Sequence, residues 1–207
     1  MNITFGRSYL RDLKKLIEVF PHDKFDSVVQ CLLEAYKRNR LIFVMGNGGS
    51  GATASHFACD INKGACLSFS KKFKVICLND NIPTMLAYAN DLSYDDVFVE
   101  QMKNFFQPED VVLAISGSGN SGNVLKAVSY AKENGGKTIA LCGYSGGKLA
   151  ELADISIVIH SDDMQKIEDL HMIVVHMLMQ SLCLAVQDYH DSLLYKVSGI
   201  DSPLSFR

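Results

Sequence analysis

The chain has 207 residues, 48% of them hydrophobic and 21% charged, so it carries enough apolar side chain for one well-packed domain. Its formal net charge of −3 argues against a protein that binds the phosphate backbone of nucleic acid, and we expect no direct nucleic-acid partner. Apolar residues never run on for about 18 positions, and the first residues lack the pattern of a secretory signal. We therefore expect no membrane partner and a cytoplasmic location.

Two helices open the predicted order of elements, at about residues 8–20 and 24–38. Short, almost wholly apolar segments predict five strands, at residues 41–45, 74–78, 111–115, 138–142 and 155–159. Helical spacing is found between them, at residues 50–63, 82–89, 95–106, 122–134 and 147–152, and a long helix over about 165–190 follows the last strand. Apolar strands that alternate with helices predict a three-layer α/β/α sandwich around a five-stranded parallel sheet. We expect one domain over residues 1–190, with leading helices in 1–38, and a loosely patterned C-terminal tail over 191–207.

Two turns in this predicted order are rich in glycine and hydroxyl groups. They are GNGGSGATASH, which follows the first strand, and SGSGNSGNV, which follows the third. In a doubly wound sheet the ligand lies beyond the carboxyl ends of the strands, where helix N-termini attract anions. The first turn matches the letters GxGxxG, but the second strand is followed by Asn79 and not by the acidic residue that a dinucleotide site needs.

The second turn carries Ser116, Ser118 and Ser121 within six residues. A single serine at such a place is more often a helix cap. Three hydroxyls in a glycine-rich frame can surround one phosphate monoester. The sequence therefore predicts a small phosphorylated ligand.

Titratable side chains recur at helical spacing. His56 and Asp60 lie four residues apart on one predicted helix face, which suits a metal ion or an acid–base pair, or else a plain surface contact. The long last helix carries Glu168, His171 and His176 among apolar residues, where a histidine is more often a satisfied core group. Glu168 and His176 are eight residues apart, about 12 Å of helix rise. Both can serve one ion only with another chain's help, so they have distinct roles or lie at a subunit boundary.

Four segments together resemble the sugar isomerase (SIS) domain, in its phosphoheptose isomerase branch. They are GNGGSGATASHFACD, AYANDLSYDDVF, LAISGSGNSGNVLKAV and KIEDLHMIVVHML, and the resemblance spans about residues 8–187. It implies a flavodoxin-like sheet and a homotetramer with active sites between protomers. It also implies conversion of sedoheptulose 7-phosphate to glycero-manno-heptose 7-phosphate, on the route to the heptose of lipopolysaccharide.

The resemblance also assigns roles to individual residues. It implies substrate contacts from Asn47, Gly48, Gly49, Ser50, Asp60, Asn90, Asp91, Ser116, Gly117, Ser118, Ser121 and Glu168. It implies a metal site, with Zn²⁺ or another divalent ion on His56, Asp60, Glu168 and His176. Within this set Asp60 would remove the proton alpha to the carbonyl, and His176 would move a proton at the neighbouring oxygen through an enediol.

Three positions depart from the family pattern, which has Glu at Asp60, Gln at Glu168 and often Thr at Gly117. An isomerase for another sugar phosphate is therefore one alternative. A second alternative is a non-catalytic SIS tetramer that binds the bacterial replication initiator, although that protein lacks the carboxylate and the second histidine that this chain keeps. If the chain is a tetramer, we expect its leading helices and its last helix to pack against sister chains, the last helix through Val174, Met177, Leu178 and Leu182.

Overall fold

The computed structural model describes residues 4–198. Its helices are α1 (Phe5–Glu18), α2 (His22–Lys37), α3 (Gly48–Lys63), α4 (Ile82–Asp91), the 3₁₀ turn η1 (Tyr94–Asp96), α5 (Val99–Lys103), α6 (Gly122–Glu133), α7 (Gly147–Leu152) and α8 (Met164–Ser198). Its strands are β1 (Leu41–Gly46), β2 (Lys74–Cys77), β3 (Val111–Ser116), β4 (Lys137–Gly143) and β5 (Ile155–Ile159).

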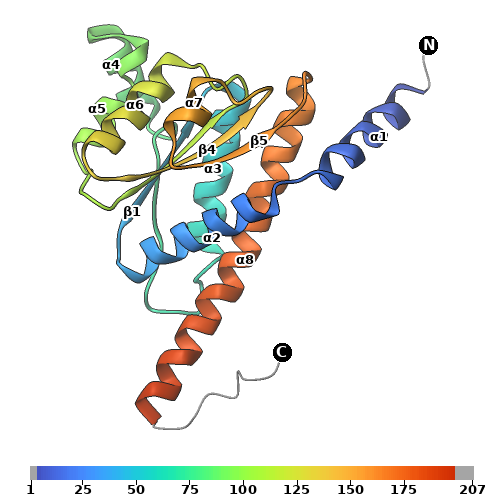
Figure 1. Ribbon diagram of the computed structural model, residues 1–207. Coiled ribbons are helices and arrows are strands. Elements are labelled where there is room, and N and C mark those ends of the chain that lie inside the picture. Colours follow the sequence, from blue (N-terminus) through green and yellow to red (C-terminus); the bar gives the residue numbers. More distant parts are fainter. Residues whose placement is uncertain (1–3, 199–207) are drawn as a thin grey trace.

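The five strands form one parallel sheet in the order β2-β1-β3-β4-β5. Helices α2, α3 and α8 cover one face, and α5, α6 and α7 cover the other (Figure 1). Neighbouring residues of β1 enter different layers, since Val44 packs in the core under α3 and α8 while Phe43 packs in the core under α5 and α6. The predicted α/β/α sandwich with a five-stranded parallel sheet is confirmed.

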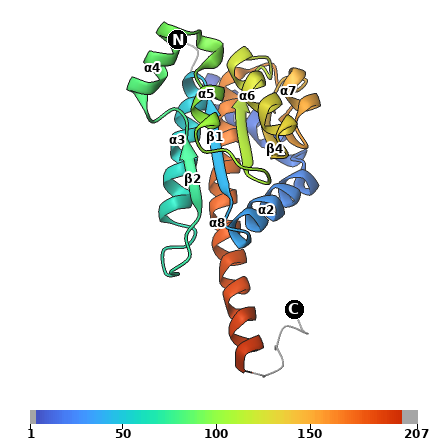
Figure 2. The same ribbon diagram turned by 90° about the vertical axis from the view of Figure 1, so that its left-hand side faces the viewer.

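The strand order places the ends of β1 and β3 at the centre of the molecule. The chain turns from β1 to β2 on one side and then crosses to β3 on the other, so the crevice between the β1 and β3 turns is the topological switch point of the sheet (Figure 2). Ligands of doubly wound folds bind at this point. Both glycine-rich turns flank it.

Helix α8 corrects two expectations. It continues to Ser198, so residues 191–198 of the predicted tail are helical, while 199–207 lie outside the described residues. Val174, Leu178 and Leu182 are fully buried within their own chain, so they are not free to pack against a sister chain, whereas Met177 is half-buried. The three buried residues lie on the face of the helix that closes the core. Among the side chains of α8 that the structure describes, the exposed apolar ones are Ile173, Leu184, Leu193 and Leu194.

By length and hydropathy, the Met164–Leu194 part of α8 could cross a membrane. This is weak evidence, because the core helix of a compact domain passes the same test, and 39% of the most apolar window is buried inside the molecule. The helix packs along α3, α2 and β4.

The predicted helix over residues 95–106 is wrong as one element. The chain forms η1 and α5 there, separated by Val97 and Phe98. Val97, Phe98 and Val99 are all buried, and three consecutive buried residues do not fit one face of an exposed helix. The chain therefore bends to bury all three.

Candidate functional site

A cavity of about 300 Å³ lies at the switch point of the sheet. It is lined by Asn47, Gly48, Gly49, Ser50, Ile115, Ser116, Gly117, Ser118, Ser121, Met164 and Glu168. These residues belong to the two glycine-rich turns and the start of α8. The structure thus brings together eleven residues from three distant stretches of the sequence, nine of which the sequence singled out.

Two helices begin at this cavity, with Asn47 as the N-cap of α3 and Ser121 as the N-cap of α6. Neither side chain makes a capping hydrogen bond to its own helix within the described part of the chain. The first backbone N–H groups of both helices are thus left without that partner, and helix N-termini in this state attract anions.

The serine hydroxyls are ordered by their own loop. Ser116 Oγ accepts from the N–H of Gly119 at 3.2 Å and lies 3.3 Å from Ser121 Oγ, and Ser118 Oγ accepts from the N–H of Asn120 at 3.2 Å. Because the backbone supplies donors to these oxygens, the hydroxyl protons of Ser116 and Ser118 can point to an acceptor such as a phosphate oxygen.

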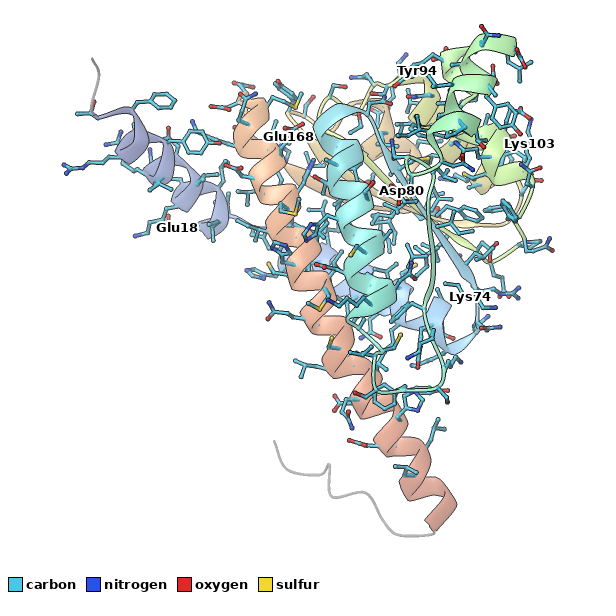
Figure 3. All side chains as sticks on the ribbon, turned by 180° about the vertical axis from the view of Figure 1, so that it is seen from behind. Glu18, Lys74, Asp80, Tyr94, Lys103 and Glu168 are labelled. Carbon is cyan, nitrogen blue, oxygen red and sulfur yellow. The ribbon has the colours of Figure 1, made fainter. Side chains whose placement is uncertain are left out.

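Two glycines let other side chains reach the cavity. A Cβ on Gly49 would lie 2.4 Å from Glu168 Oε1, so the carboxylate rests directly against the turn that begins α3. Figure 3 shows Glu168 at the start of α8, beside the start of α3. A Cβ on Gly117 would lie 2.4 Å from Met164 Sδ. Met164 thus takes up the space that a larger side chain would need at position 117.

Further along the same two helices, His56, Asp60 and His176 form a cluster. Their nearest ligand-type atoms all lie within 4.8 Å of one another. His56 Nε2 is 3.0 Å from His176 Nε2 and 3.2 Å from Asp60 Oδ2. Ligands about 2.0–2.1 Å from a tetrahedral zinc ion are about 3.3 Å apart, and catalytic zinc sites commonly use three protein ligands. The donor set and its spacing therefore fit a divalent metal ion.

The fourth predicted metal ligand lies elsewhere. Helices α3 and α8 run parallel and side by side, so Glu168 meets Gly49 at one level while His176 meets His56 two turns further on. Within one chain Glu168 belongs to the cavity, as the eight-residue spacing to His176 indicated.

Asn90 and Asp91 are exposed at the end of α4, where Asn90 Nδ2 donates to Asp91 Oδ1 at 2.8 Å. Neither lines the cavity in the described structure. The contact of these two residues with substrate therefore stays a prediction.

Two residues that the sequence did not single out lie at the site. Tyr94, just after α4, donates its hydroxyl proton to Asn47 Oδ1 at 2.9 Å, and the buried Asn123 pairs with the Asn47 amide. Both occur in segments that carry the family resemblance, but only their contacts with Asn47 single them out.

His171 differs from its neighbour His176. It is fully buried, and its Nε2 lies 3.1 Å from the carbonyl oxygen of Cys142, while its Nδ1 has no hydrogen-bond partner among the described residues. Burial lowers the pKa of His171 to about 4. The ring is therefore neutral, and His171 is a core group, the alternative that the apolar pattern favoured.

Comparison with known proteins places this chain in a family. Residues 8–143 match the SIS domain family. A phosphoheptose isomerase of Helicobacter pylori is 37% identical over 166 residues, which cover 80% of this chain and 85% of that protein. A probable phosphoheptose isomerase of Thermoplasma volcanium is 37% identical over 162 residues, covering 77% and 79%.

Solved structures agree. The phosphoheptose isomerase of Francisella tularensis superposes with a TM-score of 0.81 at 26% identity, over 87% of this chain and 95% of that one. The enzyme of Neisseria gonorrhoeae gives a TM-score of 0.78 at 26% identity, over 86% and 94%. The chain belongs to the SIS domain family, in its phosphoheptose isomerase branch, and is an isomerase. The resemblance inferred from the sequence is confirmed.

Proposed function

We propose that the protein interconverts sedoheptulose 7-phosphate and D-glycero-D-manno-heptose 7-phosphate by aldose–ketose isomerisation. The observation that carries this proposal is the switch-point cavity, where two helix N-termini and three serine hydroxyls meet in a member of the phosphoheptose isomerase branch. A phosphate monoester suits these donors because each of its oxygens accepts several hydrogen bonds.

Isomerisation moves one carbon-bound proton and one oxygen-bound proton. Asp60 would remove a proton from C1 of the ketose and return a proton to C2, while His176 would move a proton between O1 and O2 of the enediol. Both side chains reach solvent in the described chain, with the Asp60 side chain 24% exposed, so both can exchange protons. The non-catalytic SIS tetramer considered above lacks the carboxylate and the second histidine, whereas this chain has both Asp60 and His176.

A divalent ion, which we propose to be zinc, would be held by His56, Asp60 and His176. When bound, it would supply a Lewis acid that stabilises negative charge on the substrate oxygens. Glu168, close to the phosphate loops, would be the fourth member only through a rearrangement or a second chain.

We propose that copies of the chain assemble, in agreement with the expected homotetramer. Support comes from large apolar side chains that are exposed on α1 and α8, among them Leu10 and Leu184, which are 67% and 70% exposed. Their burial between copies would be favourable. The cytoplasmic location and the supply of heptose for lipopolysaccharide remain predictions.

Asp60→Asn and His176→Asn test the assignment. We expect each to lower kcat for sedoheptulose 7-phosphate by about 100-fold or more, the range typical of lost general acid–base groups. Asp26→Asn on the exposed side of α2 is the matched control and should keep full turnover. If either site variant retains wild-type kcat, the role given to that residue is wrong.

A further inference from the structure

We propose that Asn123 and Tyr94 are positioning residues that hold the Asn47 side-chain amide so that it can only donate, and not accept, a hydrogen bond at the sugar. The inference rests on the proposed function, in which Asn47 contacts substrate. It adds two residues and a direction of hydrogen bonding that the site assignment does not contain.

Three hydrogen bonds fix the Asn47 amide. Asn47 Nδ2 donates to Asn123 Oδ1 at 2.9 Å, Asn123 Nδ2 donates back to Asn47 Oδ1 at 2.9 Å, and the Tyr94 hydroxyl donates to Asn47 Oδ1 at 2.9 Å. Asn123 is only 1% exposed, so water does not readily replace its two hydrogen bonds with Asn47.

The orientation of the pair follows from a backbone group. The N–H of Val124 donates to Asn123 Oδ1 at 2.9 Å, and a backbone N–H cannot accept, so the Asn123 atom that faces it must be the oxygen. Asn123 Nδ2 then faces Asn47 and requires an oxygen there. Tyr94 must in turn donate to that oxygen.

Both lone pairs of Asn47 Oδ1 are thereby used, one by Asn123 and one by Tyr94. The Asn47 side chain keeps one N–H proton of Nδ2 for a ligand. It therefore recognises a lone pair on a hydroxyl or carbonyl oxygen. The same pairing draws the amide away from capping α3, which leaves that helix N-terminus to an anion.

The pairing also joins the two turns of the cavity, since Asn47 follows β1 and Asn123 lies in the first turn of α6. Tyr94 belongs to η1, which is held on α6 by the ion pair of Asp96 with Lys126 and by Asp95 against Gly122. Tyr94 is labelled in Figure 3 at the same end of the molecule as Glu168. The positions of the sugar-binding and phosphate-binding turns are thus coupled.

A double-mutant cycle tests whether Tyr94 acts through Asn47. We expect Tyr94→Phe to raise KM for sedoheptulose 7-phosphate about 3- to 10-fold with a smaller change in kcat, the range of one lost hydrogen bond. In an Asn47→Ala background the same change should alter KM less than about 2-fold. Asn123→Ser should behave like Tyr94→Phe in both backgrounds. Tyr130→Phe on α6, whose hydroxyl makes no hydrogen bond to the described residues, is the control.

A full Tyr94→Phe effect in the Asn47→Ala background would overturn the proposal, because Tyr94 would then contact substrate itself. So would an unchanged KM in the wild-type background. The thermal unfolding midpoints of the same proteins without substrate give a second cycle, in which we expect Tyr94→Phe to lower Tm only when Asn47 is present. If the wild type does not convert sedoheptulose 7-phosphate, the proposed function fails, and additive Tm changes would then overturn the positioning role by themselves.

Discussion

His171 and His176 lie five residues apart on α8 and have different roles. The helix directs His171 into the core and His176 towards α3. His171 is fully buried and its ring contacts the Cys142 carbonyl oxygen, whereas the exposed His176 contacts His56. The apolar sequence around both residues is the same, so the sequence pattern could not separate them. The position of the neighbouring helix separates them.

The buried His171 should make stability depend on pH. Its pKa is lowered from 6.5 to about 4, so the unfolded chain takes up a proton below pH 6.5 that the native chain takes up only near pH 4. Stability should therefore fall as the pH falls from about 6.5 to 4, by about 3 kcal/mol from this group. His171→Gln keeps a donor for the Cys142 carbonyl and cannot titrate, so denaturant unfolding should show a weaker fall over this range. The control His22→Gln should show the same fall in stability as the wild type. If stability falls as steeply in His171→Gln as in this control, His171 is not the group responsible.

Glu168 places a carboxylate against the turn at Gly49, in a cavity that we propose binds phosphate. Like charges repel, so the negative side chain should weaken binding of the substrate. We expect Glu168→Gln to lower KM for sedoheptulose 7-phosphate about 3- to 10-fold, on the scale of one charge–charge interaction in a partly wet site. Steady-state kinetics at low ionic strength measures this change. A raised KM would show that the carboxylate contributes to binding.

At the scale of elements, α8 is held on the sheet by close contact with β4. A Cβ on Gly143 would lie 2.4 Å from Ile167 Cδ1 and 2.6 Å from its Cγ2, and Ile167 is fully buried. The contact sets how near the start of α8 lies to the phosphate turn. Close packing of this kind tolerates no extra methyl group.

Gly143→Ala should thus lower the free energy of unfolding by about 1–3 kcal/mol through overpacking. Ile167→Ala alone should cost about 2–5 kcal/mol through a cavity. In the double variant the new methyl group enters the space that Ile167 leaves. The double variant should therefore lose less unfolding free energy than the two single variants lose together. Urea unfolding of the four proteins measures the coupling, and strictly additive losses would show that α8 is not seated by this contact.

The sheet, its flanking helices and the two ligand turns could be predicted, because apolar runs and glycine-rich turns are local features of the sequence. The break between η1 and α5 could not, since it depends on the burial of Val97 and Phe98 in a core built by other elements. The pairing of Asn47 with Asn123 spans 76 residues, and that of His56 with His176 spans 120. The family resemblance suggested that His56 and His176 act together. The pairing of Asn47 with Asn123 became visible only in the structure.

At the scale of the whole molecule, α1 extends away from the body and packs mainly on the start of α8 (Figure 1). Tyr9 holds it there by donating to Asp169 Oδ2 at 2.6 Å. Leu10 and Ile17 of α1 are 67% and 49% exposed. A helix that leaves such side chains in solvent gains stability when another copy covers them.

Leu10→Glu with Ile17→Glu should therefore shift the protein from an oligomer to smaller species, because charges at these positions would be buried at a contact between copies. Light scattering after size-exclusion chromatography measures the mass. Leu10→Met with Ile17→Met keeps the apolar surface and should keep the assembly. A wild-type protein that elutes as a monomer would contradict the assembly itself.

Isomerisation of a seven-carbon sugar phosphate by this chain can be followed by proton NMR of sedoheptulose 7-phosphate incubated with the purified, metal-loaded protein in D₂O. We predict that the anomeric signals of the aldose heptose 7-phosphate appear and that solvent deuterium enters the carbon beside the carbonyl, because an enediol exchanges its carbon-bound proton. A spectrum that stays unchanged with the wild-type protein, while a known phosphoheptose isomerase converts the same sample, would contradict the account.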